Sequence, residues 1–522
     1  MTLVTWSWLF LVLYIGAMLA IGYLGGRRVK HADDFATARG SYGPLWLAFA
    51  FAATTASGAT FLGGPGLAYM WGAPTIWGNF LYPIGVYFGV LICMRLIATS
   101  GNRFGNRSIP EYLGDRYQSD GIRVIVSVFS LVLFFYIVGQ LVSGLVMFEI
   151  MLGMDPLVAL IVTSAVLVIY VFMGGAHADI LTDGVQGIMM LILAAVVIVL
   201  FVFGVGVDGG GMMGVFDNLK DQDHNLVGLL NTTTPLYHSW WSIACIVVAH
   251  LPLGLLPHLG NKLWALKNTG QQRSFIKLAF TFGITLGMLG LGGLLARAML
   301  GDSLDNQNQA LPMLFIELFP PWLAALIGVG ILAAIMSTAD GLVVSSSQVI
   351  ANDLYRRTLA KWLAPNATEE QRDRQELVIS RWATVVVMII CTGLAWLLID
   401  WNVALIVWIG IGGMMAAFAG PLVMGALWKG VTRTGAYAGL ISGFVTFVVL
   451  HDQWLSPDWL DGGVLDTVIT WLHGEGPNPF SCSAIGEGVG VLFTLVVSKL
   501  TAPLPTEHLD AMFHAPEESP AS

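Results

Sequence analysis

Three segments of the chain place hydroxyl groups or helix-breaking residues inside long apolar stretches. The first, Ala53–Gly66, carries Thr54, Thr55, Ser57 and Thr60 ahead of a Gly-Gly-Pro-Gly sequence. Glycine and proline interrupt the hydrogen-bond ladder of a helix, so we expect the helix to unwind near here. Carbonyl groups released by the break can coordinate a small hard cation, and the half-helix ends can face a charged substrate group. Close helix packing through small residues is the alternative.

The second segment, Pro252–His258, has two prolines and a glycine in a later apolar stretch. It lies five predicted spans after the first interruption. Two inverted repeats of five helices, preceded by one additional helix, would place their broken helices at this separation. Two interruptions at this separation are therefore more specific evidence for an inverted repeat than a single proline kink would be.

The third segment contains Ala334, Ser337 and Thr338, and three further serines at 345–347. Neutral oxygen ligands suit sodium and bind it weakly enough to release it. Serine and threonine also bond back to their own helix, which is the alternative reading. Asp340 in the same segment is different, because a carboxylate within a membrane span is costly and often functional. A structural carboxylate, protonated or solvated in a cavity, remains the alternative.

Asp183 follows Thr182 at the predicted inner start of another span. Either residue could cap the helix N-terminus. A carboxylate at an inner mouth could also receive a departing cation, and the two roles are compatible.

The elements that position these residues are predicted to be membrane helices. The 522 residues are 56% hydrophobic and only 11% charged, with a mean hydropathy of +0.75. A soluble protein carries roughly a quarter charged residues, so most of this surface must face lipid. No basic stripe suited to nucleic acid occurs, and no obligate protein partner is evident. The four cysteines are far apart and suggest neither a disulfide framework nor a zinc site.

Apolar stretches predict an all-α polytopic protein with about thirteen spans. We place them at 3–25, 44–70, 76–98, 122–151, 156–174, 185–207, 238–260, 274–300, 320–350, 379–400, 403–427, 434–452 and 486–500. With the N-terminus outside and the C-terminus inside, all of the 24 Lys and Arg except Lys220 and Arg297 fall on the inner side, as positively charged residues should. A single transporter domain is expected over 1–502, with an extra first helix at 3–25, a core at about 44–427, peripheral helices at 434–500, and a disordered cytoplasmic tail at 503–522.

Several motifs together resemble the sodium/solute symporter family, and most of all its pantothenate and short-carboxylate branch. They are Phe61–Gly66, Arg116–Ser119, Thr182-Asp183 with Gln186, Pro257-His258, Ala334–Thr338, Asp353–Tyr355, and Gly435-Ala436 with Gly439. The resemblance implies the LeuT-like fold of five plus five inverted helices with additional helices around them. It also implies a sodium site formed by the carbonyls of Ala53, Ala56 and Ala334 and the hydroxyls of Ser337 and Thr338, with Asp183 near the sodium exit route.

The resemblance also limits the substrate. Thr55 and Ala59 stand where proline carriers have an acid and a tryptophan, and Ala59 and Thr60 stand where galactose carriers have an acid and a glutamine. A carboxylate would be held by donors, because no Lys or Arg is expected at mid-membrane. The predicted substrate-binding residues are Thr54, Thr55, Ser57 and Thr60 with nearby backbone N–H groups, and Asn79, Tyr82, Gln140 and His250, for which packing or interhelical bonding is an equal alternative.

We therefore expect sodium-coupled uptake of a small solute, by alternating access, across a bacterial inner membrane. The alternatives are an amino acid such as proline or a sugar as substrate, a proton as coupling ion, or a membrane sensor or channel. An enzyme is not expected, although His177 and Asp179 lie close together in the sequence. A primary pump is not expected either, because the sequence contains no Gly-rich phosphate-binding loop.

Overall fold

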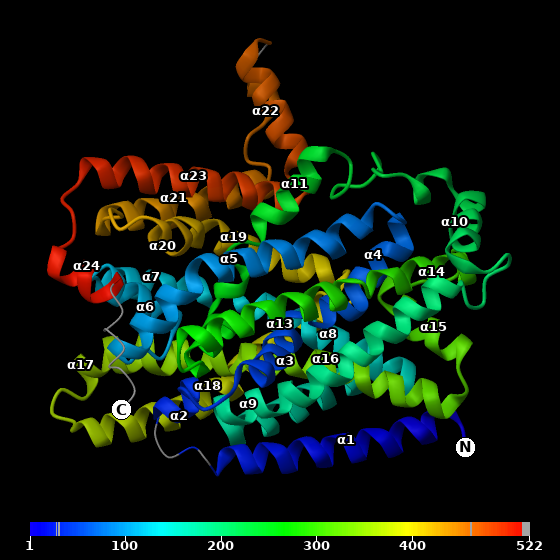
Figure 1. The fold of residues 1–522 in the computed structure, drawn as a ribbon, viewed down its shortest axis with the longest axis horizontal. Helices are drawn as coiled ribbons and strands as arrows, with labels where there is room; N and C mark the ends of the chain where they lie inside the picture. Colours follow the sequence, from blue (N-terminus) through cyan, green and yellow to red (C-terminus); the bar gives the residue numbers. More distant parts are fainter. Residues whose placement is uncertain (28, 30–31, 460–461, 514–522) are drawn as a thin grey trace.

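The computed structural model is all-helical and describes residues 1–27, 29, 32–459 and 462–513 (Figure 1). Within these residues, ten helices are long and apolar enough to cross a membrane, or up to twelve if each of two bent helix pairs counts as one span. The long helices are α1 (Leu3–Gly26), α5 (Thr75–Phe104), α8 (Leu133–Leu152), α9 (Pro156–Phe203), α13 (Thr269–Gly287), α16 (Pro321–Gln348), α18 (Glu369–Leu397), α19 (Val403–Phe418), α21 (Arg433–His451) and α23 (Pro479–Leu500).

Shorter helices connect or extend these elements. They are α2 (Ala32–Thr37), α6 (Ile109–Arg116), α7 (Asp120–Ser130), α10 (Gly211–Gln222), α14 (Gly290–Leu300), α15 (Ala310–Leu318), α17 (Ala360–Leu363), α20 (Gly425–Leu427), α22 (Val464–Glu475) and α24 (Thr506–Phe513). Three π-helical turns, η1 (Ala59–Gly63), η6 (Val349–Leu359) and η7 (Ala419–Met424), interrupt or follow long helices.

The number of thirteen spans stays a prediction. The expected spans at 156–174 and 185–207 both fall in α9, whose described residues include a candidate span at Ala176–Phe203. An earlier stretch of the same helix, Pro156–Ile169, is also apolar. Orientation across the membrane stays a prediction from the charge distribution.

Both predicted helix breaks are confirmed. α3 (Pro44–Thr55) and the helix over Ala59–Trp71, formed by η1 and α4 (Gly64–Trp71), meet at 61°. The second break separates Trp240–Leu255, formed by α11 (Trp240–Ala249) and η3 (Leu253–Leu255), from Pro257–Ala265, formed by α12 (Pro257–Gly260) and η4 (Asn261–Ala265), at 54°.

The first break lies ahead of the Gly-Gly-Pro-Gly sequence rather than within it. Ala56 and Ser57 are not helical, whereas Pro65 lies in the first turn of α4. The π-helical turn η1 directly precedes α4, and such a local adjustment is one way in which a membrane helix accommodates a proline. The unwound residues are therefore the small and hydroxylated ones.

The broken helix α3 is held in the middle of the bundle between α9 and α16. Almost every residue of α16 from Ala324 onward is buried, which is typical of a helix surrounded by protein. α9 approaches α3 closely at Gly187, where a β-carbon would lie 2.5 Å from the Phe49 carbonyl oxygen. This contact brings Asp183, one turn earlier on α9, against the end of α3.

The C-terminal segment differs from the expected disordered tail. Thr506–Phe513 forms α24, which packs against the C-terminal end of α5. Arg103 donates to the Ala511 carbonyl at 2.9 Å, and the Arg116 guanidinium lies 4.9 Å from the centre of the Phe513 ring. Met512 is buried, so one apolar side of this short helix packs against the rest of the protein. The rest of the predicted tail, 514–522, lies outside the described residues.

Candidate functional site

A set of buried oxygen atoms joins the end of α3 to the middle of α16. Ser337 donates its hydroxyl to the Ala53 carbonyl at 3.1 Å and to the Ala334 carbonyl at 2.8 Å. The Thr338 hydroxyl lies 3.5 Å from the Ala53 carbonyl oxygen. All four residues are fully buried. The structure thus brings together four of the five residues that the resemblance assigned to sodium, and we refer to this set as the oxygen cage.

Two further observations refine the cage. Thr338 also donates to the Thr54 carbonyl at 3.0 Å, which adds an oxygen that sequence reasoning did not assign. Ala56, the fifth predicted ligand, ends α3 with a non-helical backbone, and its N–H bonds the Ala52 carbonyl. Only neutral oxygens form the cage, which fits a monovalent hard cation that must also be released. A cation there would take the hydroxyl lone pairs while their protons turn toward other acceptors.

The break is braced by α8. The Gly58 N–H donates to Gln140 Oε1 at 2.8 Å, and a β-carbon on Gly58 would lie 2.3 Å from the Ser143 hydroxyl oxygen. Gln140 was predicted to contact substrate, but in the structure it holds the unwound backbone. Glycine is required at position 58 by this close approach.

We expect Gln140→Met to destabilise the protein by about 1–3 kcal/mol, because the buried Gly58 N–H loses its acceptor. The matched control is Ser143→Ala, which removes a neighbouring hydroxyl that bonds the Gly139 carbonyl of its own helix. Thermal unfolding of the purified protein measures both. Equal midpoints for the two variants would contradict a bracing role for Gln140.

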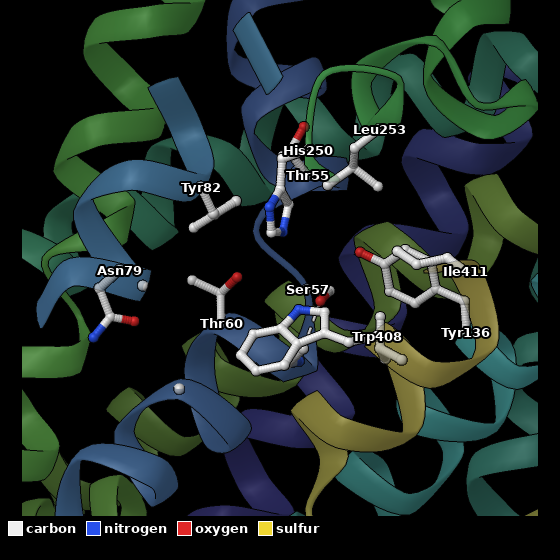
Figure 2. A pocket seen from close by; sticks show the side chains of 14 residues that line it. Thr55, Ser57, Thr60, Asn79, Tyr82, Tyr136, His250, Leu253, Trp408 and Ile411 are labelled. Carbon is white, nitrogen blue, oxygen red and sulfur yellow. Dashed lines mark hydrogen bonds between the residues drawn. The ribbon is translucent and has the colours of Figure 1, made fainter. Parts of the chain in front are cut away.

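A cavity with about 480 Å³ of empty space lies on the other side of the unwound segment (Figure 2). Figure 2 shows side chains from the broken α3–α4 segment, α5, α8, the α11 end and α19 turned toward it. The lining residues are Thr55, Ser57, Ala59, Thr60, Gly64, Gly78, Asn79, Tyr82, Tyr136, His250, Leu253, Val407, Trp408 and Ile411. Six of the eight predicted substrate-binding residues are among them, and we refer to this space as the central pocket.

The polar groups of the central pocket are neutral. None of the lining residues within the described chain is an Asp, Glu, Lys or Arg. His250 Nδ1 lies 2.5 Å from the Ile246 carbonyl oxygen, which can only accept, so Nδ1 carries the proton. In the neutral ring, Nε2 is then an acceptor, and it has no partner among the described residues, nor does the Asn79 amide nitrogen. These groups can serve a bound polar solute.

Backbone N–H groups contribute less than the sequence suggested. The N–H groups of Ala59, Thr60 and Phe61 already donate to the hydroxyl or carbonyl oxygen of Ser57. Donors for a substrate must therefore come from side chains. Tyr136 and Trp408 were not predicted, because α8 and α19 are apolar on nearly every face and no periodicity marks the inward side.

Thr54 does not face the central pocket. Its hydroxyl accepts from Lys262 Nζ at 2.7 Å and donates to Asp183 Oδ2 at 2.6 Å. Lys262 was expected in a polar inner segment, but it is only 4% exposed. It forms ion pairs with Asp183 at 2.5 Å and with Asp179 at 2.8 Å. The sequence pattern could not predict the contact of Lys262 with these carboxylates, because Lys262 follows the second helix break.

The helix-cap reading of Asp183 is wrong. Asp183 lies inside α9 and is fully buried, with Ala176 as the first residue of that span. Asp340 lies beside it: oxygens of Asp179, Asp183 and Asp340 are all within 4.8 Å of one another. His177 and Asp179 do not form a catalytic pair, since His177 contacts Tyr42 at 3.0 Å whereas Asp179 contacts Lys262.

Comparisons with known proteins found a family model and relatives that match most of this chain. A family model described as the sodium:solute symporter family matches residues 35–443. The sodium/proline symporter of Salmonella typhimurium is 30% identical over 499 residues, which cover 89% of this chain and 92% of that protein. The sodium/pantothenate symporter of Escherichia coli is 28% identical over 423 residues, covering 78% and 82%.

The fold is also similar to a solved structure, a sodium-coupled sialic acid symporter in a substrate-bound outward-open state. The TM-score is 0.73 at 20% identity, and the match covers 95% of this chain and 98% of the other. At this identity the likeness establishes the arrangement of helices and nothing about the solute.

Proposed function

The chain belongs to the sodium:solute symporter family, and from that membership we propose that it takes up a small organic carboxylate together with sodium. It is a membrane protein with many spans, its coupling ion is sodium, and its relatives are carriers rather than enzymes. One observation supports the proposal most strongly: the oxygen cage and the central pocket share a single segment, Ala53–Thr60, which contains the break in the helix.

This shared segment provides the coupling. Ala53 and Thr54 present carbonyls to the cage, whereas Thr55 and Ser57 line the central pocket. Sodium bound at the cage would fix the end of α3 against α16, and thereby fix the backbone that carries the pocket side chains. Rocking of one helix bundle against the other would then expose the pocket to the inside, and sodium would leave past Asp183. In this order of events sodium binds at the oxygen cage, the solute binds in the central pocket, and sodium then leaves past Asp183.

The carboxylate is supported by the character of the pocket. Neutral donors, Thr60 and the Asn79 amide among them, can hydrogen-bond a carboxylate without a competing negative charge. The bound sodium supplies the positive charge. Opposite unit charges about 8 Å apart attract by about 2 kcal/mol at an effective dielectric constant of 20. The aromatic rings of Tyr82, Tyr136 and Trp408 suit the short apolar part of a pantothenate or monocarboxylate.

The driving force is adequate for uptake. One sodium ion contributes about 1.4 kcal/mol for each tenfold concentration ratio. The membrane potential adds about 2.3 kcal/mol per net charge at 100 mV. A monoanion moving with one sodium carries no net charge, so the concentration gradient alone would drive it.

An amino acid is the second candidate. The sodium/proline symporter relative covers most of this chain, and His250 Nε2 offers a lone pair that could accept from an ammonium group. Uptake by purified protein in vesicles, with sodium or choline outside, tests both candidates. A panel of pantothenate, acetate, pyruvate, proline and glucose should show sodium stimulation for a carboxylate. Stimulation by proline alone would favour the second candidate, and uptake of any solute without sodium would overturn the coupling.

Replacing Thr60 by valine should raise the KM for the solute about tenfold, because a pocket hydroxyl is lost while the shape is kept. The sodium concentration for half-maximal uptake should change by less than about threefold. Ser130→Ala, which removes a buried hydroxyl that bonds the Val126 carbonyl of its own helix, is the control. An unchanged KM would remove Thr60 from the substrate contacts.

A further inference from the structure

Lys262 occupies the centre of a buried acidic cluster. It lies in η4, directly after the second helix break. An ammonium group has three N–H donors, and each has an acceptor here: Asp183 Oδ2, Asp179 Oδ2 and the Thr54 hydroxyl. Three contacts between 2.5 and 2.8 Å fill its hydrogen-bonding capacity.

The cluster contains a third carboxylate besides the two that pair with Lys262. Asp340 on α16 contributes the third carboxylate within 4.8 Å. Its Oδ1 accepts the Gly341 N–H at 2.8 Å, while Oδ2, buried, has no hydrogen-bond partner in the part of the chain described. Gly341 lets Asp179 lie close to the backbone of α16, because a β-carbon at position 341 would lie only 3.3 Å from Asp179 Oδ1. Three converging carboxylates and a hydroxyl are the hard oxygen ligands that a small cation prefers.

The cluster lies next to the oxygen cage. Thr54 belongs to both, since its carbonyl accepts from Thr338 and its hydroxyl contacts Lys262. On its other side, a cavity with about 290 Å³ of empty space is lined by Asp179, Lys262 and Ser345 and extends to Thr37. A cation leaving the cage toward this cavity would pass the cluster.

We propose that the ammonium group of Lys262 is a built-in cation of the cluster of Asp179, Asp183 and Asp340, so that each cycle moves one sodium ion, the one in the oxygen cage. This proposal rests on the sodium-coupled uptake proposed above and adds its stoichiometry. A second sodium would need the two carboxylate oxygens and the Thr54 hydroxyl that Lys262 already contacts. It would also lie beside the ammonium charge, whose repulsion at about 4 Å offsets the attraction of the carboxylates by roughly a thousandfold in affinity.

Removing the ammonium should create a second sodium site. In Lys262→Met the side chain keeps its length and loses its charge, so three carboxylates face one another without a counter-ion. Buried carboxylates without a counter-charge are costly, and their oxygens are ligands for a hard cation that would supply this charge. In Lys262→Arg the positive charge stays, and the cluster should keep its single resident cation.

The test measures the ratio of radiolabelled sodium to radiolabelled solute taken up by vesicles containing the full-length protein. We expect one sodium per solute for the unchanged protein and for Lys262→Arg, and about two for Lys262→Met, with the Hill coefficient for sodium rising from about one toward two. For a monoanionic solute, uptake by Lys262→Met should also become sensitive to an imposed membrane potential.

If Lys262→Met does not fold, the ratio of sodium to solute measured for the unchanged protein still tests the proposal. Two sodium ions per solute in the unchanged protein would overturn the role of Lys262 and leave sodium-coupled uptake intact. A folded Lys262→Met that still moves one sodium per solute would overturn it as well. Accumulation without any sodium would instead overturn the proposed function itself.

Discussion

Replacing Ser337 and Thr338 together by alanine is expected to raise the sodium concentration for half-maximal uptake at least tenfold. The double variant removes both side-chain oxygens of the oxygen cage and leaves only the carbonyls of Ala53, Thr54 and Ala334. Each hydroxyl contributes a coordinating oxygen in a fully buried site, and a loss of about 1.4 kcal/mol is already tenfold in affinity. Initial uptake rates measured over a range of sodium concentrations give the shift.

The control for this variant is again Ser130→Ala, whose hydroxyl is buried on α7, far from the cage in the sequence, and bonds the Val126 carbonyl of its own helix. It should leave the sodium dependence unchanged. If the double variant also kept the sodium dependence of the unchanged protein, the oxygens between α3 and α16 would not be the sodium site.

Asp183→Asn should slow turnover by about 10- to 100-fold while changing the KM for the solute by less than about threefold. Asp183 is remote from the central pocket lining but contacts Thr54 and Lys262, so its charge acts on ion release rather than on solute binding. The variant removes one of the two carboxylates that pair with the buried ammonium group of Lys262. A buried charge that loses its partners costs several kcal/mol.

Uptake rates at saturating sodium and varied solute separate turnover from KM. Asp217→Asn on α10 is the control, because that carboxylate is exposed. Normal turnover in Asp183→Asn would reduce this residue to a structural partner of Lys262.

Much of the fold could be predicted because it depends on local signals. Long apolar stretches predicted α1, α5 and α16 closely, and glycine and proline predicted both breaks. The exact unwound residues were less predictable. Pro65 is a helix breaker in general, yet it lies inside the helix over Ala59–Trp71, directly after the π-helical turn η1, and the break lies at Ala56 and Ser57 instead.

The site could be predicted where a single segment carries the chemistry. The hydroxyl cluster pointed to Ser337 and Thr338, and the family resemblance implied the Ala53 carbonyl, whereas neither indicated the Thr54 carbonyl. Lys262 was missed for a different reason. A lysine near the end of an apolar stretch reads as an inner-surface charge, and only the 54° bend turns it back into the bundle toward Asp183.

Trp408 and Tyr136 were missed because a fully buried apolar helix has no polar face. On α8 and α19, nearly every residue is buried, so periodicity does not separate the pocket side from the packing side. Contacts between helices far apart in the sequence decide which aromatic rings reach the central pocket.

The most direct measurement of the central claim is the entry of radiolabelled sodium into vesicles when the transported solute is added outside. If the oxygen cage and the central pocket are coupled through Ala53–Thr60, solute should accelerate sodium entry in the unchanged protein, and the Ser337→Ala and Thr338→Ala double variant should lose most of that acceleration. Solute that accumulates while sodium entry stays at its resting rate would contradict the account.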